Sequence, residues 1–104
     1  RWIAFASPKC GRVFINDGAR HALMEGKASL LPAGVTRIED HFEKGDVVGI
    51  VDPEGKEFAR GMVNYSSEEA GKMLGLHSAD IDEQIVPSKH YDALITRDNI
   101  VLLP

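Results

Sequence analysis

Val47-Val48-Gly49-Ile50-Val51, followed by Asp52-Pro53-Glu54-Gly55, carries the strongest structural signal in the chain. Five consecutive apolar or small residues, three of them valine, are too few for a helix and indicate a buried strand. The proline and glycine in the next four residues stand where a tight turn favours them. Because Phe58 to Tyr65 follows as a second strand-like run, the sequence predicts a β-hairpin over residues 47–65.

On the N-terminal side of this hairpin the sequence predicts three more strands and one helix. The strands are expected at residues 2–5, 12–15 and 35–39, with a loop over residues 7–11 and the helix over residues 19–25. A side-chain oxygen of Asn16 or Asp17 can cap that helix, and Gly26 stops it. Pro32 has no backbone N–H to donate to a neighbouring strand, so its segment is expected at a sheet edge or a bend rather than in a central strand.

On the C-terminal side the sequence predicts two short helices and two short strands. Ser66 and Glu69 fit a capping box, which opens a helix that ends at Gly75. A second, acidic helix is expected over residues 79–85, and strands over residues 93–95 and 99–103. The total is about five to seven short strands with two or three short helices in no alternating βαβ order. This pattern predicts a mixed β fold with short helices (α+β), in the form of a small barrel.

Length and composition indicate one domain over residues 1–104. With 43% hydrophobic and 27% charged residues, the chain has the balance of an ordinary globular protein. No apolar run reaches the roughly 20 residues of a membrane helix, so no membrane association is expected. One cysteine, Cys10, excludes an internal disulfide and suggests a reduced, cytoplasmic compartment. The first residue is Arg1 rather than methionine, so we expect a piece of a longer polypeptide.

The charge of the chain is unevenly distributed. The formal net charge is −4, the wrong sign for generic nucleic-acid binding. Residues 1–37, however, carry six basic and two acidic groups, whereas residues 38–104 carry six basic and fourteen acidic ones. This distribution allows either a weakly basic face on an acidic body or scattered, solvated lysines and arginines.

No arrangement of residues in the sequence predicts an active site. There is no phosphate-binding or dinucleotide glycine motif, and the four histidines lack the spacing of metal ligands. Lys9 and Arg12 could lower the pKa of the Cys10 thiol, but no base is spaced to activate it as a nucleophile. The acidic cluster of Asp80, Asp82 and Glu83 is best explained as the solvated start of a helix. The chain itself is therefore expected to hold no catalytic residue, cofactor or metal.

Several segments carry a resemblance to a known domain family. They are residues 13–19, 22–23, 29–35, 42–48 and 59–67. A Gly-Asp pair before one strand (Gly45-Asp46) and the Ala59-Arg60-Gly61 triplet before the next are typical of the family. In these features the chain resembles PUA domains, named for pseudouridine synthases and archaeosine transglycosylases. The resemblance implies a PUA-like pseudo-barrel.

A narrower resemblance covers residues 1 to about 103. Its most specific part is Arg97-Asp98-Asn99-Ile100-Val101-Leu102-Leu103, and residues 2–5 and 64–67 add to it. These stretches resemble the C-terminal domain of the bacterial glutamate 5-kinase family. The resemblance implies a parent enzyme that phosphorylates the side-chain carboxylate of L-glutamate with Mg-ATP. This reaction is the first step of proline biosynthesis, and the enzyme is inhibited by proline. Its kinase domain would precede Arg1.

Two functions remain open from this resemblance. One is a regulatory or assembly module that packs on the kinase domain of its own polypeptide, or on a neighbouring subunit of a homo-oligomer. The other is an RNA-binding module, because PUA domains elsewhere bind RNA, commonly through the first helix and the following glycine-containing loop. The candidate RNA contacts are Arg12, Arg20, His21, Lys27 and Arg37. The acidic body and the lack of an aromatic residue between Phe14 and Phe42 favour the first function.

Overall fold

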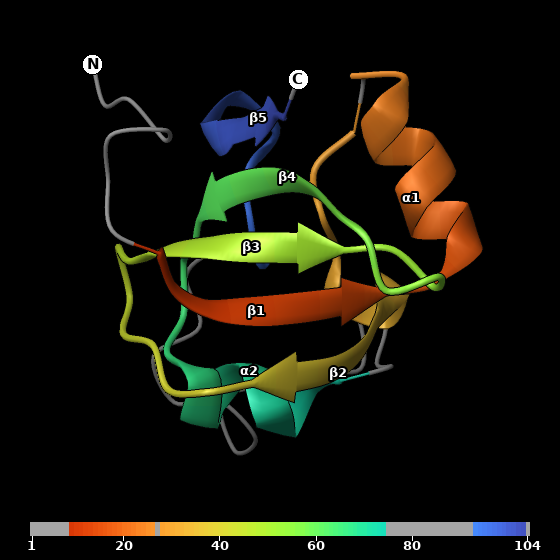
Figure 1. Ribbon diagram of the computed structural model, residues 1–104. Helices are drawn as coiled ribbons and strands as arrows, with labels where there is room; N and C mark the ends of the chain where they lie inside the picture. Colours follow the sequence, from red (N-terminus) through yellow and green to blue (C-terminus); the bar gives the residue numbers. More distant parts are fainter. Residues whose placement is uncertain (1–8, 27, 75–92, 104) are drawn as a thin grey trace.

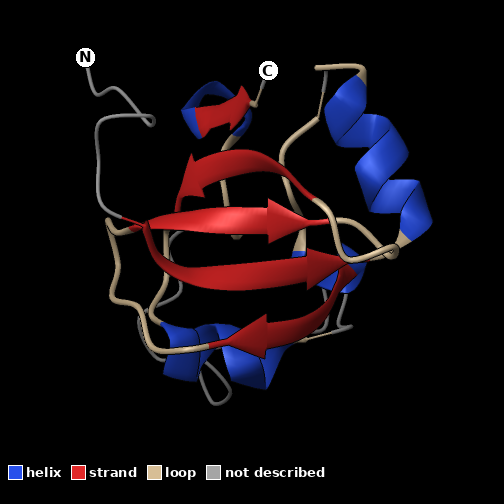
Figure 2. Ribbon diagram, viewed as in Figure 1, coloured by secondary structure: helices blue, strands red, loops and turns tan. Residues whose placement is uncertain are grey.

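The computed structural model describes residues 9–26, 28–74 and 93–103, and its five strands form one mixed sheet (Figures 1 and 2). In chain order the elements are β1 (Lys9–Ile15), α1 (Asp17–Met24), β2 (Val35–Glu39), β3 (Val47–Val51), β4 (Glu57–Met62), α2 (Ser67–Met73) and β5 (Ile100–Leu102). Five strands and two α-helices among the described residues confirm the predicted mixed β fold with short helices.

The strands lie in the order β2-β1-β3-β4-β5. β1 pairs antiparallel with β2 and parallel with β3, whereas β3–β4 and β4–β5 are antiparallel. Helix α1 stands beside the sheet, near the end to which β1 and β3 point, and α2 lies along the edge strand β2 (Figure 1). The segment of Pro32 precedes this edge strand as a 3-10 turn, Pro32–Gly34, as the sequence predicts.

The predicted hairpin is confirmed, and β3 is its most buried strand. All five residues of β3 are buried, so both faces of the strand are covered. Asp52 is buried at the end of β3, where its Oδ1 accepts the backbone N–H groups of Glu54 and Lys56, each at 2.9 Å. Gly55 adopts a φ of 88°, which a residue with a Cβ atom rarely adopts. A side-chain-capped turn thus fixes the register of β3 and β4.

One hydrophobic core lies between the sheet and the segments that cover it. Alternate residues of β1, Val13 and Ile15, point into it, as the two-residue period of a strand requires. Between the sheet and α2, Tyr65, Phe42 and Met73 are at most 2% exposed. The described part of the chain therefore supplies its own core.

The predicted loop over residues 7–11 is wrong from Lys9 onward, because β1 begins there. Gly11 belongs to the strand rather than to a turn. A Cβ atom at this position would stand 2.9 Å from the carbonyl oxygen of Glu39 and 3.1 Å from the Phe42 ring. Glycine is present here because two other segments approach its backbone closely.

Two predicted strands are shorter than expected. The strand over residues 58–65 ends at Met62, because the Asn64 N–H donates to the carbonyl of Leu94 instead of to β3. The strand over residues 93–95 is a single bridge between Leu30 and Ile95. The partner segment turns into the 3-10 helix at Pro32, two residues after Leu30. The last predicted strand is confirmed as β5, with Asn99 in the turn before it.

The helix predictions are confirmed with shifted boundaries. α1 begins at Asp17, two residues earlier than expected, because Asn16 is the residue that caps it. The predicted capping box of Ser66 and Glu69 is present at the start of α2, which ends at Met73. The strand over residues 2–5, Gly75 and the helix over residues 79–85 lie outside the described residues. Among the described residues no helix is long enough to span a bilayer, since α1 has eight residues and α2 seven.

Candidate functional site

The candidate RNA-binding region, α1 and the segment after it, forms a shallow groove of about 340 Å³. Its floor is built from small residues on both sides. The lining residues are Asn16, Gly18, Ala19, Ala22, Ala28, Ser29, Leu31, Ala33 and Gly34. None of them carries a charge, so the groove itself offers mostly apolar surface.

Close packing between helix and turn sets the shape of this groove. A Cβ atom at Gly34 would stand 2.7 Å from the Ala19 Cβ, so the helix lies as near the turn as glycine permits. The Asn16 N–H donates to the Gly34 carbonyl at 2.9 Å, and the Asn16 Oδ1 accepts the Ala19 N–H at 2.8 Å. One asparagine thus joins the turn to the first turn of α1.

Replacing Asn16 by alanine should lower the free energy of unfolding by about 1 kcal/mol, because an N-terminal N–H of α1 loses its acceptor. Urea denaturation of the purified chain measures this loss. Asn16→Asp is the matched control, since its carboxylate keeps an acceptor at the same place. An equal loss in both variants would contradict the assigned role of the side chain.

The two candidate RNA contacts on α1 both face carboxylates of the same helix. Arg20 Nε lies 3.4 Å from Asp17 Oδ1, and His21 Nε2 lies 3.1 Å from Glu25 Oε1. The side chains of Asp17, His21 and Glu25 are largely solvent-exposed, and that of Arg20 is partly exposed. The helix therefore presents charge pairs, which attract a phosphate less than isolated cations would. Lys27, the third candidate of this region, lies outside the described residues.

The other two candidates, Arg12 and Arg37, lie on the sheet. Strand register places Arg37 opposite Phe14 and Glu39 opposite Arg12. The Glu39 carboxylate binds the guanidinium groups of both arginines, and Arg37 Nη2 lies 3.2 Å from Glu39 Oε2. The Phe14 ring holds both arginines by cation–π contacts, with Cζ-to-centroid distances of 4.0 Å for Arg37 and 5.4 Å for Arg12.

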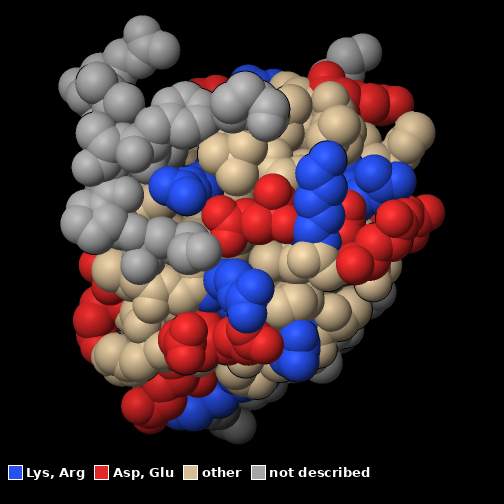
Figure 3. All heavy atoms as spheres, viewed as in Figure 1, with Lys and Arg blue, Asp and Glu red and all other residues tan. Residues whose placement is uncertain are grey.

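The five candidates are thus divided between a helix and two strands. On the viewed face of the sheet, lysines and arginines are interleaved with acidic residues (Figure 3). A depression of about 490 Å³ lies beside the Phe14–Arg37 contact, and Thr36, Asp52 and Glu54 also line it. Sequence reasoning missed Phe14 as part of this cluster. In β1 the half-buried Arg12 and Phe14 alternate with buried residues, which places Phe14 on the outer face of the sheet.

A second polar cluster lies where the β2–β3 loop meets α2. His41 Nε2 lies 2.5 Å from Glu43 Oε2, and its Nδ1 lies 3.2 Å from Ser67 Oγ. The order serine–histidine–carboxylate is that of a nucleophilic triad. The side chains of His41 and Glu43 are 74% and 64% exposed, however, so the cluster is open to water. The network ties the β2–β3 loop to the start of α2.

The Cys10 thiol has a raised pKa, not the lowered one that Lys9 and Arg12 suggest. Partial removal from water raises the pKa, and the Asp46 carboxylate raises it further through its charge and a hydrogen bond. A poorly ionised thiol is a poor nucleophile. No group of three or more histidine, cysteine, aspartate or glutamate side chains in the described residues could hold a metal ion.

The alkylation of Cys10 by iodoacetamide should therefore reach its half-maximal rate at a higher pH than that of a free cysteine. Asp46→Asn should move the midpoint to lower pH, because the thiolate no longer faces a negative charge. The remote variant Asp98→Asn is the matched control and should leave the midpoint in place. Mass spectrometry of the single-cysteine chain gives the rates. A midpoint unchanged by Asp46→Asn would contradict this account of the pKa.

Comparison with known proteins agrees with this architecture. The profile of the PUA domain matches residues 11–85. Among solved structures, a PUA domain from Aeropyrum pernix K1 superimposes with a TM-score of 0.61 and 24% identity, over 83% of this chain and 41% of that one. The archaeal box H/ACA sRNP complex contains a chain that matches with a TM-score of 0.54 and 23% identity, over 86% of this chain and 26% of that one. At these identities the two structures show the shared fold.

The similar sequences are glutamate 5-kinases. The one from Thermoanaerobacter sp. (strain X514) is 47% identical over 102 residues, and the one from Saccharophagus degradans is 46% identical over 103 residues. These alignments cover 98% and 99% of this chain but 27% of each relative, so the chain spans about a quarter of their length. They confirm the narrower resemblance seen in the sequence. By its profile match, its sheet and its relatives, the chain belongs to the PUA domain family.

Proposed function

We propose that this chain is the non-catalytic PUA domain of a cytoplasmic glutamate 5-kinase, which makes L-glutamyl 5-phosphate from L-glutamate and Mg-ATP. In this proposal the domain modulates the enzyme's activity, its feedback inhibition by proline or its assembly into a homo-oligomer. The observation that carries the proposal is the 47% identity to such a kinase over nearly the whole chain. ATP and Mg²⁺ would bind outside these 104 residues.

The chemistry of the described residues supports a non-catalytic role. In the triad-like cluster at Ser67, His41 and Glu43, the histidine and glutamate side chains are largely exposed to water. The thiol of Cys10 has a raised pKa. A domain without a catalytic site acts through the surfaces by which it binds other molecules. The net charge of −4 favours a protein as the partner over a polyanion such as RNA.

Deleting the segment from the full-length kinase tests this function. We expect the deletion to change at least one of three measured properties: the turnover rate, the proline concentration for half-inhibition, or the oligomeric state by light scattering. The control is the full-length enzyme carrying Lys72→Glu, which changes an exposed side chain on α2 and should leave the domain folded. If the deletion leaves all three properties unchanged, the proposal is wrong.

RNA binding is the second candidate, and the place of the chain in the PUA family is the observation that favours it. One of its structural neighbours belongs to a box H/ACA sRNP. We would titrate the chain with bulk tRNA at low and physiological salt, and repeat the titration with Arg20→Glu/Lys27→Glu. RNA binding through α1 predicts weaker affinity in this variant and a salt slope smaller by about one per lost phosphate contact. Lys72→Glu is the matched control, and absence of binding at low salt would eliminate this candidate.

A further inference from the structure

Three large apolar side chains are exposed among the described residues. Met24 is 51% exposed, Leu31 48% and Leu102 40%. Leu31 belongs to the groove between α1 and the 3-10 turn. The other two come from distant parts of the sequence, the last residue of α1 and the end of β5, and line one slot.

This slot has a volume of about 170 Å³ and lies between α1, β4 and β5. Its lining residues are Met24, Lys56, Glu57, Phe58, Leu102 and Leu103. The Leu103 N–H donates to the Phe58 carbonyl at 2.9 Å, which fixes the end of the chain against β4. Phe58 is only 8% exposed, whereas Met24 and Leu102 remain open to water. Apolar side chains gathered around one opening are typical of a protein contact.

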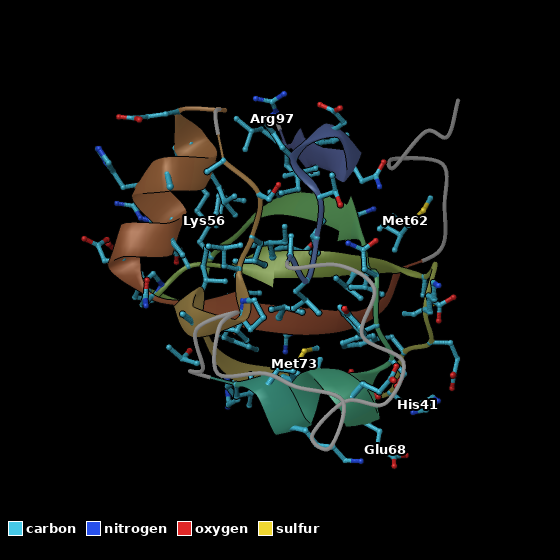
Figure 4. All side chains as sticks on the ribbon, turned by 180° about the vertical axis from the view of Figure 1, so that it is seen from behind. His41, Lys56, Met62, Glu68, Met73 and Arg97 are labelled. Atoms are coloured by element: carbon cyan, nitrogen blue, oxygen red, sulfur yellow. The ribbon has the colours of Figure 1, made fainter. Side chains whose placement is uncertain are left out.

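The charges at the slot favour an acidic partner group. The Glu57 carboxylate lies 3.3 Å from Arg60 Nε on β4, so its charge is compensated within the strand. Lys56 is exposed, and in the described part of the chain its ammonium group makes no ion pair. Figure 4 shows Lys56 beside α1, on the side that faces the sheet. The slot is therefore apolar with one uncompensated positive charge at its rim.

The size of the slot restricts what can occupy it. Pockets for drug-sized molecules measure about 300–1,000 Å³, so a slot of 170 Å³ suits one large side chain rather than a nucleotide. RNA recognition needs several cations, and a single lysine among apolar groups does not supply them. About three quarters of the length of the kinase relatives lies outside the region that matches this chain, which gives a protein surface that could cover the slot.

We propose that the slot formed by Met24, Phe58, Leu102 and Leu103 is the docking site for the kinase portion of the same polypeptide. The kinase portion inserts one large apolar side chain, and a carboxylate next to it pairs with Lys56. This inference rests on the proposed function and adds the surface through which the domain contacts the enzyme.

Methionine oxidation tests the docking site, because hydrogen peroxide converts exposed thioethers to sulfoxides faster than buried ones. The chain has three methionines: Met24 at the slot, Met62 at the end of the sheet away from α1, and Met73 buried as the last residue of α2 (Figure 4). We would compare their oxidation rates by peptide mass spectrometry in the 104-residue chain and in the full-length kinase. Docking predicts that Met24 loses its reactivity in the full-length kinase, whereas Met62 and Met73 keep their rates.

Two variants of the full-length kinase sharpen the test. Lys56→Glu should restore Met24 oxidation to the rate of the 104-residue chain, and Lys72→Glu, a matched reversal on α2, should not. Equal Met24 rates in both proteins, or protection of Met24 by tRNA in the 104-residue chain, would overturn the docking site. This outcome is separable from failure of the proposed function. Protection of Met24 together with unchanged kinetics and assembly after domain deletion would support docking while refuting modulation.

Discussion

Phe42→Ala should lower the free energy of unfolding by about 3–5 kcal/mol, the usual cost of removing a fully buried aromatic side chain. Phe42 is 0% exposed and packs against Gly11, and its backbone N–H and carbonyl both bond to Ser67. Its ring therefore fills the space between β1 and the start of α2. Alanine would leave a cavity there, because the hydrogen bonds between Phe42 and Ser67 fix the position of the backbone and prevent it from collapsing into the space.

Urea denaturation at constant temperature measures this effect, and circular dichroism shows whether the variant still folds. Leu31→Ala is the matched control, because it also shortens a large apolar side chain but at a position that is 48% exposed. We expect the control to cost less than about 1 kcal/mol. Similar losses in the two variants would contradict the assignment of Phe42 to the core.

Gly34→Ala should destabilise the chain by about 1–3 kcal/mol, as overpacking of a close contact does. The new Cβ would stand 2.7 Å from the Ala19 Cβ, below any ordinary carbon–carbon contact. Ala19 has no rotatable side chain that could move aside. Helix α1 would have to shift outward, which weakens its contacts with the core and widens the groove beside it.

The double variant Gly34→Ala/Ala19→Gly isolates this contact. Ala19→Gly alone should cost about 1 kcal/mol, because glycine is a poor helix former. If the two methyl groups collide, the double variant is more stable than the sum of both single losses predicts. Strict additivity in urea denaturation would show that Gly34 is required for another reason.

The elements that the sequence predicts well are those whose signal is local. β3 is a run of five apolar or small residues with a turn directly after it, and the capping box at Ser66 and Glu69 needs only four residues to be recognised. The start of β1 is different. Gly11 lies in a segment whose composition is that of a loop. Its strand conformation depends on Glu39 and Phe42, which lie about thirty residues away in the sequence.

The candidate site shows the same division. The sequence places Arg20 and His21 on α1, because the helix is recognised from its N-cap residue and from the helical spacing of its apolar residues. The pairing of Arg12 and Arg37 through Glu39 follows from the register of β1 and β2, which the sequence does not state. For the same reason the slot could not be foreseen, because Met24 and Leu102 meet only when the sheet brings the end of the chain next to α1.

The parallel pairing of β1 with β3 determines the order in which the chain can fold. Val13 pairs with Ile50, so the central ladder closes only after α1 and β2 have been enclosed within a long loop. The β3–β4 hairpin, in contrast, closes through a short turn capped by Asp52. We expect the hairpin to form before β1 docks on it, and a chain with so many distant pairings to fold in milliseconds to seconds rather than in microseconds. Until β1 docks, one edge of β3 has no partner, and in that interval the newly made chain is most exposed to aggregation.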